Sequence, residues 1–111
     1  MEKPHKKLDV WQGAMKSTTA IYKLTERLPE AEKYGLVSQM RRAAISIPCN
    51  IAEGAARKGK REFRNFLSMA QGSLSELDTQ LAQLPQFVEK NALFMRGWDF
   101  FSHYFPPDAR S

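Results

Sequence analysis

"FRNFLSMAQGSLSELDTQLAQL", residues 63–84, contains the hydrophobic repeat that decides the fold class of this chain. Apolar side chains recur there at spacings of three and four residues, which places them on one face of an α-helix. Pro85 follows directly and is expected to end that helix, because proline cannot continue helical hydrogen bonding. The stretch predicts one long amphipathic helix, whose repeat comprises Phe63, Leu67, Ala70, Leu74, Leu77, Leu81 and Leu84.

Similar repeats on either side of this stretch predict three further helices. The repeat before it comprises Leu36, Met40, Ala44, Ile47 and Ile51, and the first comprises Trp11, Met15, Thr18, Tyr22, Thr25 and Leu28, ended by Pro29. A shorter aromatic repeat precedes "FPPDARS" at 105–111 and comprises Phe94, Trp98, Phe101 and Phe105. No hairpin pattern or internal repeat interrupts the series. We therefore expect an all-α, antiparallel up-and-down four-helix bundle with short connections.

Composition limits the class of protein. The 111 residues are 42% hydrophobic and 26% charged, which is typical of one globular domain spanning 1–111, with frayed tails at 1–8 and 106–111. No stretch approaches eighteen apolar residues, and the basic start has no apolar segment after it, so we expect a cytoplasmic protein and no membrane. Cys49 is the single cysteine, which agrees with a reducing compartment. We expect it to be a small residue of the core.

The second helical repeat contains an interior proline. Pro48 has no amide hydrogen and its ring crowds the carbonyl of residue 44, so we expect it to kink the helix. Ser46 and Asn50 are the nearby polar side chains that could satisfy the freed carbonyls. Either the kink shapes the bundle or it forms a binding pocket.

Glu53 and Gly54 follow the proline and belong to the same structural motif. Glu53 is either a charge on the helix face or a partly buried acid paired with Arg41, Arg42 or Arg57, since an unpaired buried carboxylate is too unfavourable to keep. The motif as a whole comprises Pro48, Asn50, Glu53 and Gly54.

A basic run follows at residues 57–64, "RKGKREFR". Residues 57–60 predict a turn, because Gly59 breaks helices and can adopt positive φ, and the next helix is expected to start near Arg61. With a net charge of +5, this run favours an anionic partner such as RNA or DNA, although charge at a turn is also typical of a solvated surface. The candidate nucleic-acid-binding residues are Arg57, Lys58, Lys60, Arg61 and Arg64, with Arg41 and Arg42 as further candidates.

Catalytic and metal-binding patterns are weak. His5 and His103 are the only histidines, and the one Glu-x-x-His pattern, at residues 2–5, contains a proline and lies in the expected tail. Cys49 has no histidine nearby in the sequence, and no glycine-rich phosphate loop is present. We expect no enzyme activity, no metal and no cofactor.

Four strings of this sequence resemble, in order and spacing, the small four-helix-bundle proteins first noticed as open reading frames in intervening sequences of bacterial 23S ribosomal RNA genes. They are "VWQ" at 10–12, "YGL" with "SQMRRAA" at 34–44, "SIPCNIAEG" at 46–54 and "FLSMAQGSLSEL" at 66–77. The resemblance covers residues 10–81 and lapses after Leu81, where an atypical aromatic C-terminal segment follows.

The resemblance implies an antiparallel four-helix bundle that assembles as a ring-shaped homopentamer, with no known catalytic activity. The accessory variability protein of diversity-generating retroelements is similar in fold, and there a basic pentameric barrel works with a reverse transcriptase and binds nucleic acid. Two functional hypotheses follow for this chain. One is an oligomeric nucleic-acid-binding accessory module that uses the basic run, and the other is a structural or protein-interaction scaffold that binds no nucleic acid.

Overall fold

The computed structural model of the chain describes residues 4–84, and every regular element in that range is helical. Three α-helices dominate it: α1 at Asp9–Thr25, α2 at Ser38–Ala55 and α3 at Lys60–Ala82. Shorter pieces are the 3-10 helices η1 at Pro4–Lys7 and η2 at Glu30–Glu32, and the π-helical segment η3 at Lys33–Val37, which leads directly into α2. The predicted fourth helix, around residues 94–105, lies outside the described residues.

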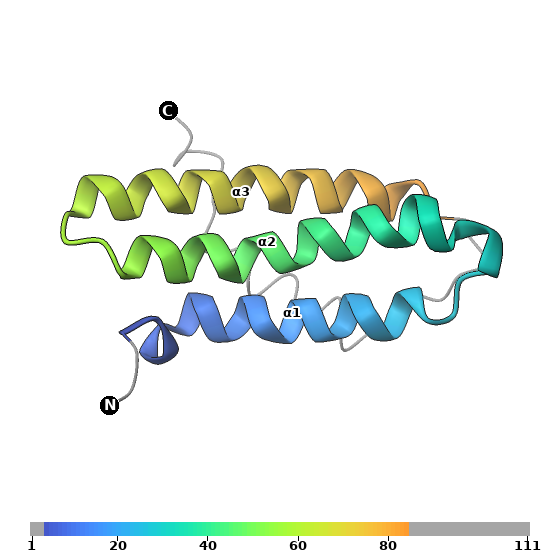
Figure 1. The fold of residues 1–111 in the computed structure, drawn as a ribbon, viewed down its shortest axis with the longest axis horizontal. Helices are drawn as coiled ribbons and strands as arrows, with labels where there is room; N and C mark the ends of the chain where they lie inside the picture. Colours follow the sequence, from blue (N-terminus) through green and yellow to red (C-terminus); the bar gives the residue numbers. More distant parts are fainter. Residues whose placement is uncertain (1–3, 85–111) are drawn as a thin grey trace.

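The three helices lie side by side and antiparallel, with α2 in the middle (Figure 1). Because the chain reverses direction twice, the start of α1 and the turn between α2 and α3 lie at the same end of the layer. Side-chain contacts fix the register on both sides of α2. Thr18 of α1 reaches Ala44, and Ser73 of α3 accepts a 2.6 Å hydrogen bond from the hydroxyl of Ser46.

The repeats predicted for α2 and α3 are confirmed as core positions. In α2, Met40, Ala44, Ile47 and Ile51 are each at most 1% exposed. Of the third repeat, the positions from Ala70 to Leu84 are buried, whereas Phe63 and Leu67 near the start of α3 are half-buried. The core of the described residues comprises Ala14, Ile21, Leu24, Met40, Ala43, Ala44, Ile47, Ile51, Ala70, Leu74, Leu77, Leu81 and Leu84.

The repeat predicted for α1 is wrong in its orientation. Met15, assigned to the buried face, is 41% exposed, whereas Ala14, Ile21 and Leu24 are buried. Of the other predicted positions, Thr25 is buried at 3% exposed and Thr18 is half-buried, and both make polar contacts to α2. The aromatic and β-branched residues of the predicted repeat lie at the edge of the contact with α2 rather than in the core. Small buried residues such as Ala14 contribute little to a hydrophobic pattern, so the pattern did not show the buried face.

Pro48 lies inside an uninterrupted α2 (Figure 1), and a hydrogen bond from the neighbouring helix accommodates it. The carbonyl of Ala44, which Pro48 cannot engage, lies 3.0 Å from the Thr18 hydroxyl of α1. The same hydroxyl lies 3.0 Å from the carbonyl of Ala14, so one proton serves two acceptors. Thr18 therefore takes the role that the sequence analysis gave to Ser46 and Asn50, while the kink itself stays a prediction.

Ser46 and Asn50 bond to other groups. The Ser46 hydroxyl contacts the carbonyl of Ala43 at 2.7 Å as well as Ser73, and the Asn50 amide donates to the carbonyl of Ser46 at 2.9 Å. Asn50 thus stays within its own helix, whereas Ser46 links α2 to α3. Neither side chain reaches the carbonyl that the proline frees.

Two glycines shape the end of the layer where α2 meets α3. A Cβ on Gly54 would lie 2.7 Å from the Cβ of Phe66 and 3.1 Å from the ring of Phe63, so the close helix approach requires glycine here. Gly59 has φ −112° and ψ 147°, an extended conformation directly before α3. The turn therefore does not use the positive φ that glycine permits, and it is made with ordinary backbone angles.

The beginning of the described chain is folded onto the start of α1. Residues 4–8 belong to the predicted frayed tail, yet Pro4–Lys7 forms η1 and Leu8 packs against the core. His5 contacts the Trp11 ring edge to face, with 4.9 Å between ring centroids. This arrangement holds η1 at the same end as the turn between α2 and α3 (Figure 1).

Candidate functional site

The predicted basic run forms one end of the helical layer. Residues 56–59 make the turn, and α3 begins at Lys60, one residue before the predicted start. Among the described residues, four cations of this run are exposed and form no ion pair: Lys58, Lys60, Arg61 and Arg64. The amide groups at the start of a 23-residue helix add positive potential at the same place. Glu62 in the first turn is the opposing charge.

Arg57 differs from the other cations of the run because it has two partners. Its guanidinium lies 2.8 Å from the Glu53 carboxylate, one turn earlier on α2, and 5.4 Å from the centre of the Phe66 ring. The Arg57 and Glu53 side chains are 47% and 55% exposed, so this is a surface pair and contributes little to stability. Glu53 is thus a helix-face charge paired with one of its three predicted partners.

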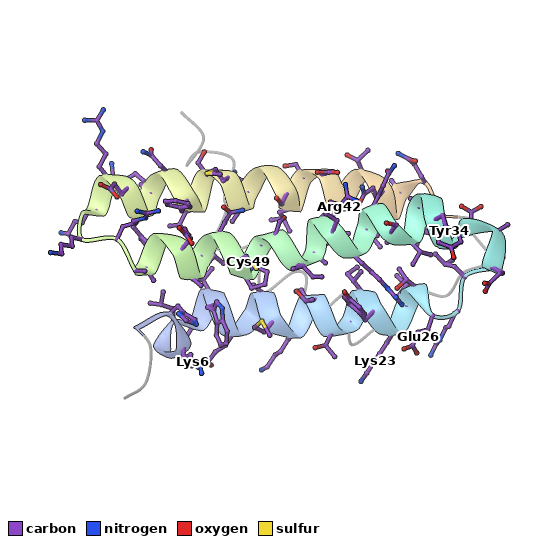
Figure 2. The ribbon with its side chains drawn as sticks, in the orientation of Figure 1. Lys6, Lys23, Glu26, Tyr34, Arg42 and Cys49 are labelled. Carbon is purple, nitrogen blue, oxygen red and sulfur yellow. The ribbon has the colours of Figure 1, made fainter. Side chains whose placement is uncertain are left out.

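Lys6 is a cation that the sequence analysis did not include in the site. It lies on η1, 51 residues before Arg57 in the chain, and Figure 2 shows it beside the start of α1, on the far side of α2 from α3. Its side chain is exposed. The expectation of a frayed tail concealed it.

Arg41 and Arg42 do not join this basic end. Arg41 precedes Arg57 by sixteen residues, which along a helix corresponds to about 24 Å. Arg41 is also occupied: its Nε donates to the Thr25 hydroxyl at 2.9 Å, its Nη2 donates to the Tyr22 carbonyl at 3.3 Å, and its guanidinium lies 4.4 Å from the Tyr22 ring centre. A cation at the last turn of α1 stabilises that helix end. The side chain therefore joins two helices.

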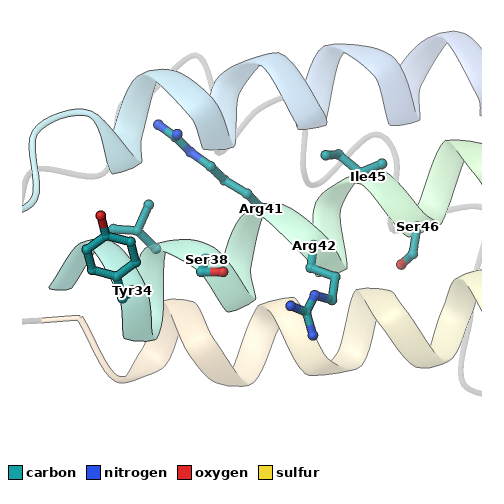
Figure 3. A pocket seen from close by; sticks show the side chains of 7 residues that line it. Tyr34, Ser38, Arg41, Arg42, Ile45 and Ser46 are labelled. Atoms are coloured by element: carbon teal, nitrogen blue, oxygen red, sulfur yellow. The ribbon is translucent and has the colours of Figure 1, made fainter.

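Arg42 is exposed and extends from α2 toward α3, opposite to Arg41 (Figure 3). No ion pair of Arg42 is found among residues 4–84. It borders an open hollow of about 630 Å³ on the exposed face of α2, lined by Tyr34, Val37, Ser38, Arg41, Arg42, Ile45 and Ser46. Arg42 is thus available for a contact, but at a place separate from the basic end.

The family of the chain follows from its whole helical region. The model of the 23S rRNA-intervening sequence protein family matches residues 6–87, which includes all three α-helices and the basic end. This chain belongs to that family. The match confirms the resemblance found in the sequence strings. A comparison with curated proteins gave no match.

Other kinds of site find no support in the described part of the chain. Residues 4–84 contain no group of three or more His, Cys, Asp or Glu side chains placed to hold a metal ion. None of the helices in this range is both long and apolar enough to cross a membrane.

Proposed function

We propose that this family member is a non-enzymatic, cytoplasmic accessory protein that binds nucleic acid through the phosphates, using the basic end of its helical layer. The observation that carries the proposal is the group of unpaired, exposed cations around the start of α3: Lys58, Lys60, Arg61 and Arg64. Lys6, exposed beside the start of α1 on the other side of α2, is a further candidate (Figure 2). Cations of this kind bind phosphates with little dependence on base sequence.

The structure supports phosphate contact better than base recognition. The aromatic side chains near the basic end, Trp11, Phe63 and Phe66, are half-buried, and Phe66 lies beneath Arg57. Base stacking needs exposed rings, so these residues favour packing over base recognition. We therefore propose that RNA and DNA bind with similar affinity when their phosphate spacing is similar.

We further propose that residues after 84 complete a four-helix bundle and that five copies form a ring. The resemblance of the sequence to pentameric bundle proteins supports this assembly. A closed ring would repeat the basic end once per subunit, and the summed charge would strengthen binding to a long polyanion. Light scattering checks the assembly, with a pentamer as the expected particle and a stable monomer as the contradicting one.

The binding proposal is tested by neutralising cations in matched positions. Lys60→Gln, Arg61→Gln and Arg64→Gln remove three charges from the basic end, whereas Lys16→Gln, Lys23→Gln and Arg27→Gln remove three exposed charges elsewhere. Both triple variants lower the net charge from +5 to +2, so net charge alone cannot separate them. Anisotropy titration with RNA and DNA at about 0.1 M salt, where screening acts beyond about 10 Å, is the measurement.

The first triple variant should lose most binding, and the second should retain it. For the wild type, the logarithm of affinity should fall with the logarithm of salt concentration by roughly 0.9 for each phosphate neutralised on duplex DNA. Circular dichroism serves as the folding control, because removing cations from a helix start does not destabilise the helix. Equal binding by both triple variants would mean that the phosphate site lies elsewhere. If the wild type fails to bind at low salt, the protein-interaction scaffold replaces this proposal.

A further inference from the structure

The exposed face of α2 has a cation near one end and an anion near the other. It is therefore complementary in charge to an antiparallel copy of itself. Arg42, Ile45, Cys49 and Glu53 are all exposed and follow one another at spacings of three and four residues, so they share one face of the helix. The opposite face holds the buried positions such as Ile47 and Ile51. Along the exposed face the order is therefore cation, apolar residue, thiol and anion.

Each neighbouring helix has an exposed methionine at about the level of the apolar middle of this face. Thr18 lies level with Ala44, so Met15, three residues earlier on the antiparallel α1, lies near the level of Ile47. Ser73 lies level with Ser46, so Met69, four residues earlier on α3, lies near the level of Asn50. Each helix thus contributes one exposed large apolar side chain to the same section of the layer: Met15 at 41%, Ile45 at 41% and Met69 at 56% exposed.

We propose that this surface, called here the α2 face and defined by Arg42, Ile45, Cys49 and Glu53, binds the same face of a second copy of the chain. An antiparallel second α2 would place Arg42 of each copy beside Glu53 of the other, and the Ile45 and Cys49 positions between them. Two ion pairs and one apolar centre then arise from four residues by twofold symmetry. Met15 and Met69 flank the contact, and their unbranched side chains adapt to a neighbouring surface.

The charges of this face favour a second copy over a nucleic acid. A polyanion would meet the Glu53 carboxylate and an apolar strip, whereas the unpaired cations at the basic end offer it a better surface. A second copy presents an anion to Arg42, which has no ion pair among residues 4–84 (Figure 3). The Glu53 carboxylate can accept from Arg42 of the copy while its Oε1 keeps Arg57, because a carboxylate accepts several hydrogen bonds.

Cys49 is exposed, so its expected place in the core is wrong. It supplies a direct test because it is the single cysteine and lies near the centre of the face (Figure 2). In the antiparallel arrangement, the two Cys49 thiols approach each other near the twofold axis. A short bis-maleimide should therefore link two full-length chains at Cys49, as seen by electrophoresis and peptide mapping. Analytical ultracentrifugation of the untreated protein gives the dimer affinity.

Charge exchange makes the test specific. Arg42→Glu and Glu53→Arg, made separately, should each weaken the dimer roughly tenfold, because each sets like charges against each other twice. The double variant should restore the pairs and return the affinity to the wild-type range. Lys23→Glu, an exposed change of the same sign on α1, is the matched control and should leave the dimer unchanged. Ile45→Glu should abolish the crosslink while circular dichroism stays unchanged.

The inference is overturned if wild-type chains do not crosslink through Cys49, or if the double variant is no better than either single variant. It does not depend on nucleic-acid binding, and it can be separated from the proposed ring. Neighbours in a ring of five contact each other through unlike surfaces, so equivalent Cys49 thiols would not meet there. A pentamer in which Cys49 does not crosslink contradicts this inference and agrees with the proposed ring. Crosslinked pairs within a ten-chain particle support both proposals.

Discussion

The two ends of α2 both carry arginine, but they use it differently. At the beginning of the helix, Arg41 bonds to the Thr25 hydroxyl and the Tyr22 carbonyl of α1. Just beyond the far end, Arg57 pairs only with the exposed Glu53 of α2 and lies over the Phe66 ring, whereas Lys58 and the other cations of the basic run are left to solvent. The difference teaches that an arginine joins helices where another helix ends beside it, whereas most cations stay exposed where the chain merely turns.

The largest expected effect concerns the helix approach at the basic end. Gly54→Ala should lower the free energy of unfolding by about 2 kcal/mol, because its Cβ would meet the Phe66 Cβ at 2.7 Å and force the helices apart. Gly72→Ala is the control, since a Cβ there meets nothing within 4 Å. That change should raise stability by about 0.5–1 kcal/mol through helix propensity. Urea unfolding of both variants provides the measurement, and equal effects would contradict the close approach.

The next effect distinguishes the adjacent arginines on α2. Arg41→Met should lower the free energy of unfolding by about 1.5 kcal/mol, because it leaves the Thr25 and Tyr22 contacts unmade. Arg42→Met should change it by less than about 0.5 kcal/mol, as is usual for an exposed residue. Thermal melts of the two variants at low protein concentration measure the difference, and a smaller loss for Arg41 than for Arg42 would reverse the assignment.

Between the two ends, the hydrogen bond of Thr18 can be tested through its coupling to the proline. Thr18→Val should lower the free energy of unfolding by about 1 kcal/mol, because the Ala44 carbonyl then loses its donor. In a Pro48→Ala background the restored amide at position 48 can donate to that carbonyl, so the same threonine change should have a smaller effect. A double-mutant cycle from urea unfolding measures the coupling. Strict additivity would show that Thr18 does not substitute for the missing amide.

The smallest effect tests whether Lys6 belongs with the basic end. Lys6→Gln should reduce the slope of log affinity against log salt by about 0.9 on duplex DNA, if its ammonium contacts one phosphate. Lys23→Gln, an exposed change near the other end of α1, should leave the slope unchanged (Figure 2). Anisotropy titrations across a salt series provide the data, and identical slopes for both variants would remove Lys6 from the site.

Much of the helical region was accessible from the sequence because its signals are local. The spacing of Leu74, Leu77 and Leu81 predicts the buried face of α3, and "RKGK" at 57–60 predicts the turn to within one residue. The orientation of α1 was not accessible in this way. Met15 is the more hydrophobic of two neighbours, yet Ala14 is buried and Met15 is exposed, because packing against α2 decides which face of α1 turns inward.

The sequence by itself determined an all-α chain of the 23S rRNA-intervening sequence protein family, since helical period, turn residues and family strings are properties of neighbouring residues. Only the tertiary structure decided which polar groups meet. It gave the Ala44 carbonyl to Thr18 and bound Arg41 to the end of α1. These contacts join residues on different elements, and their geometry depends on how antiparallel helices pack, which no local pattern encodes.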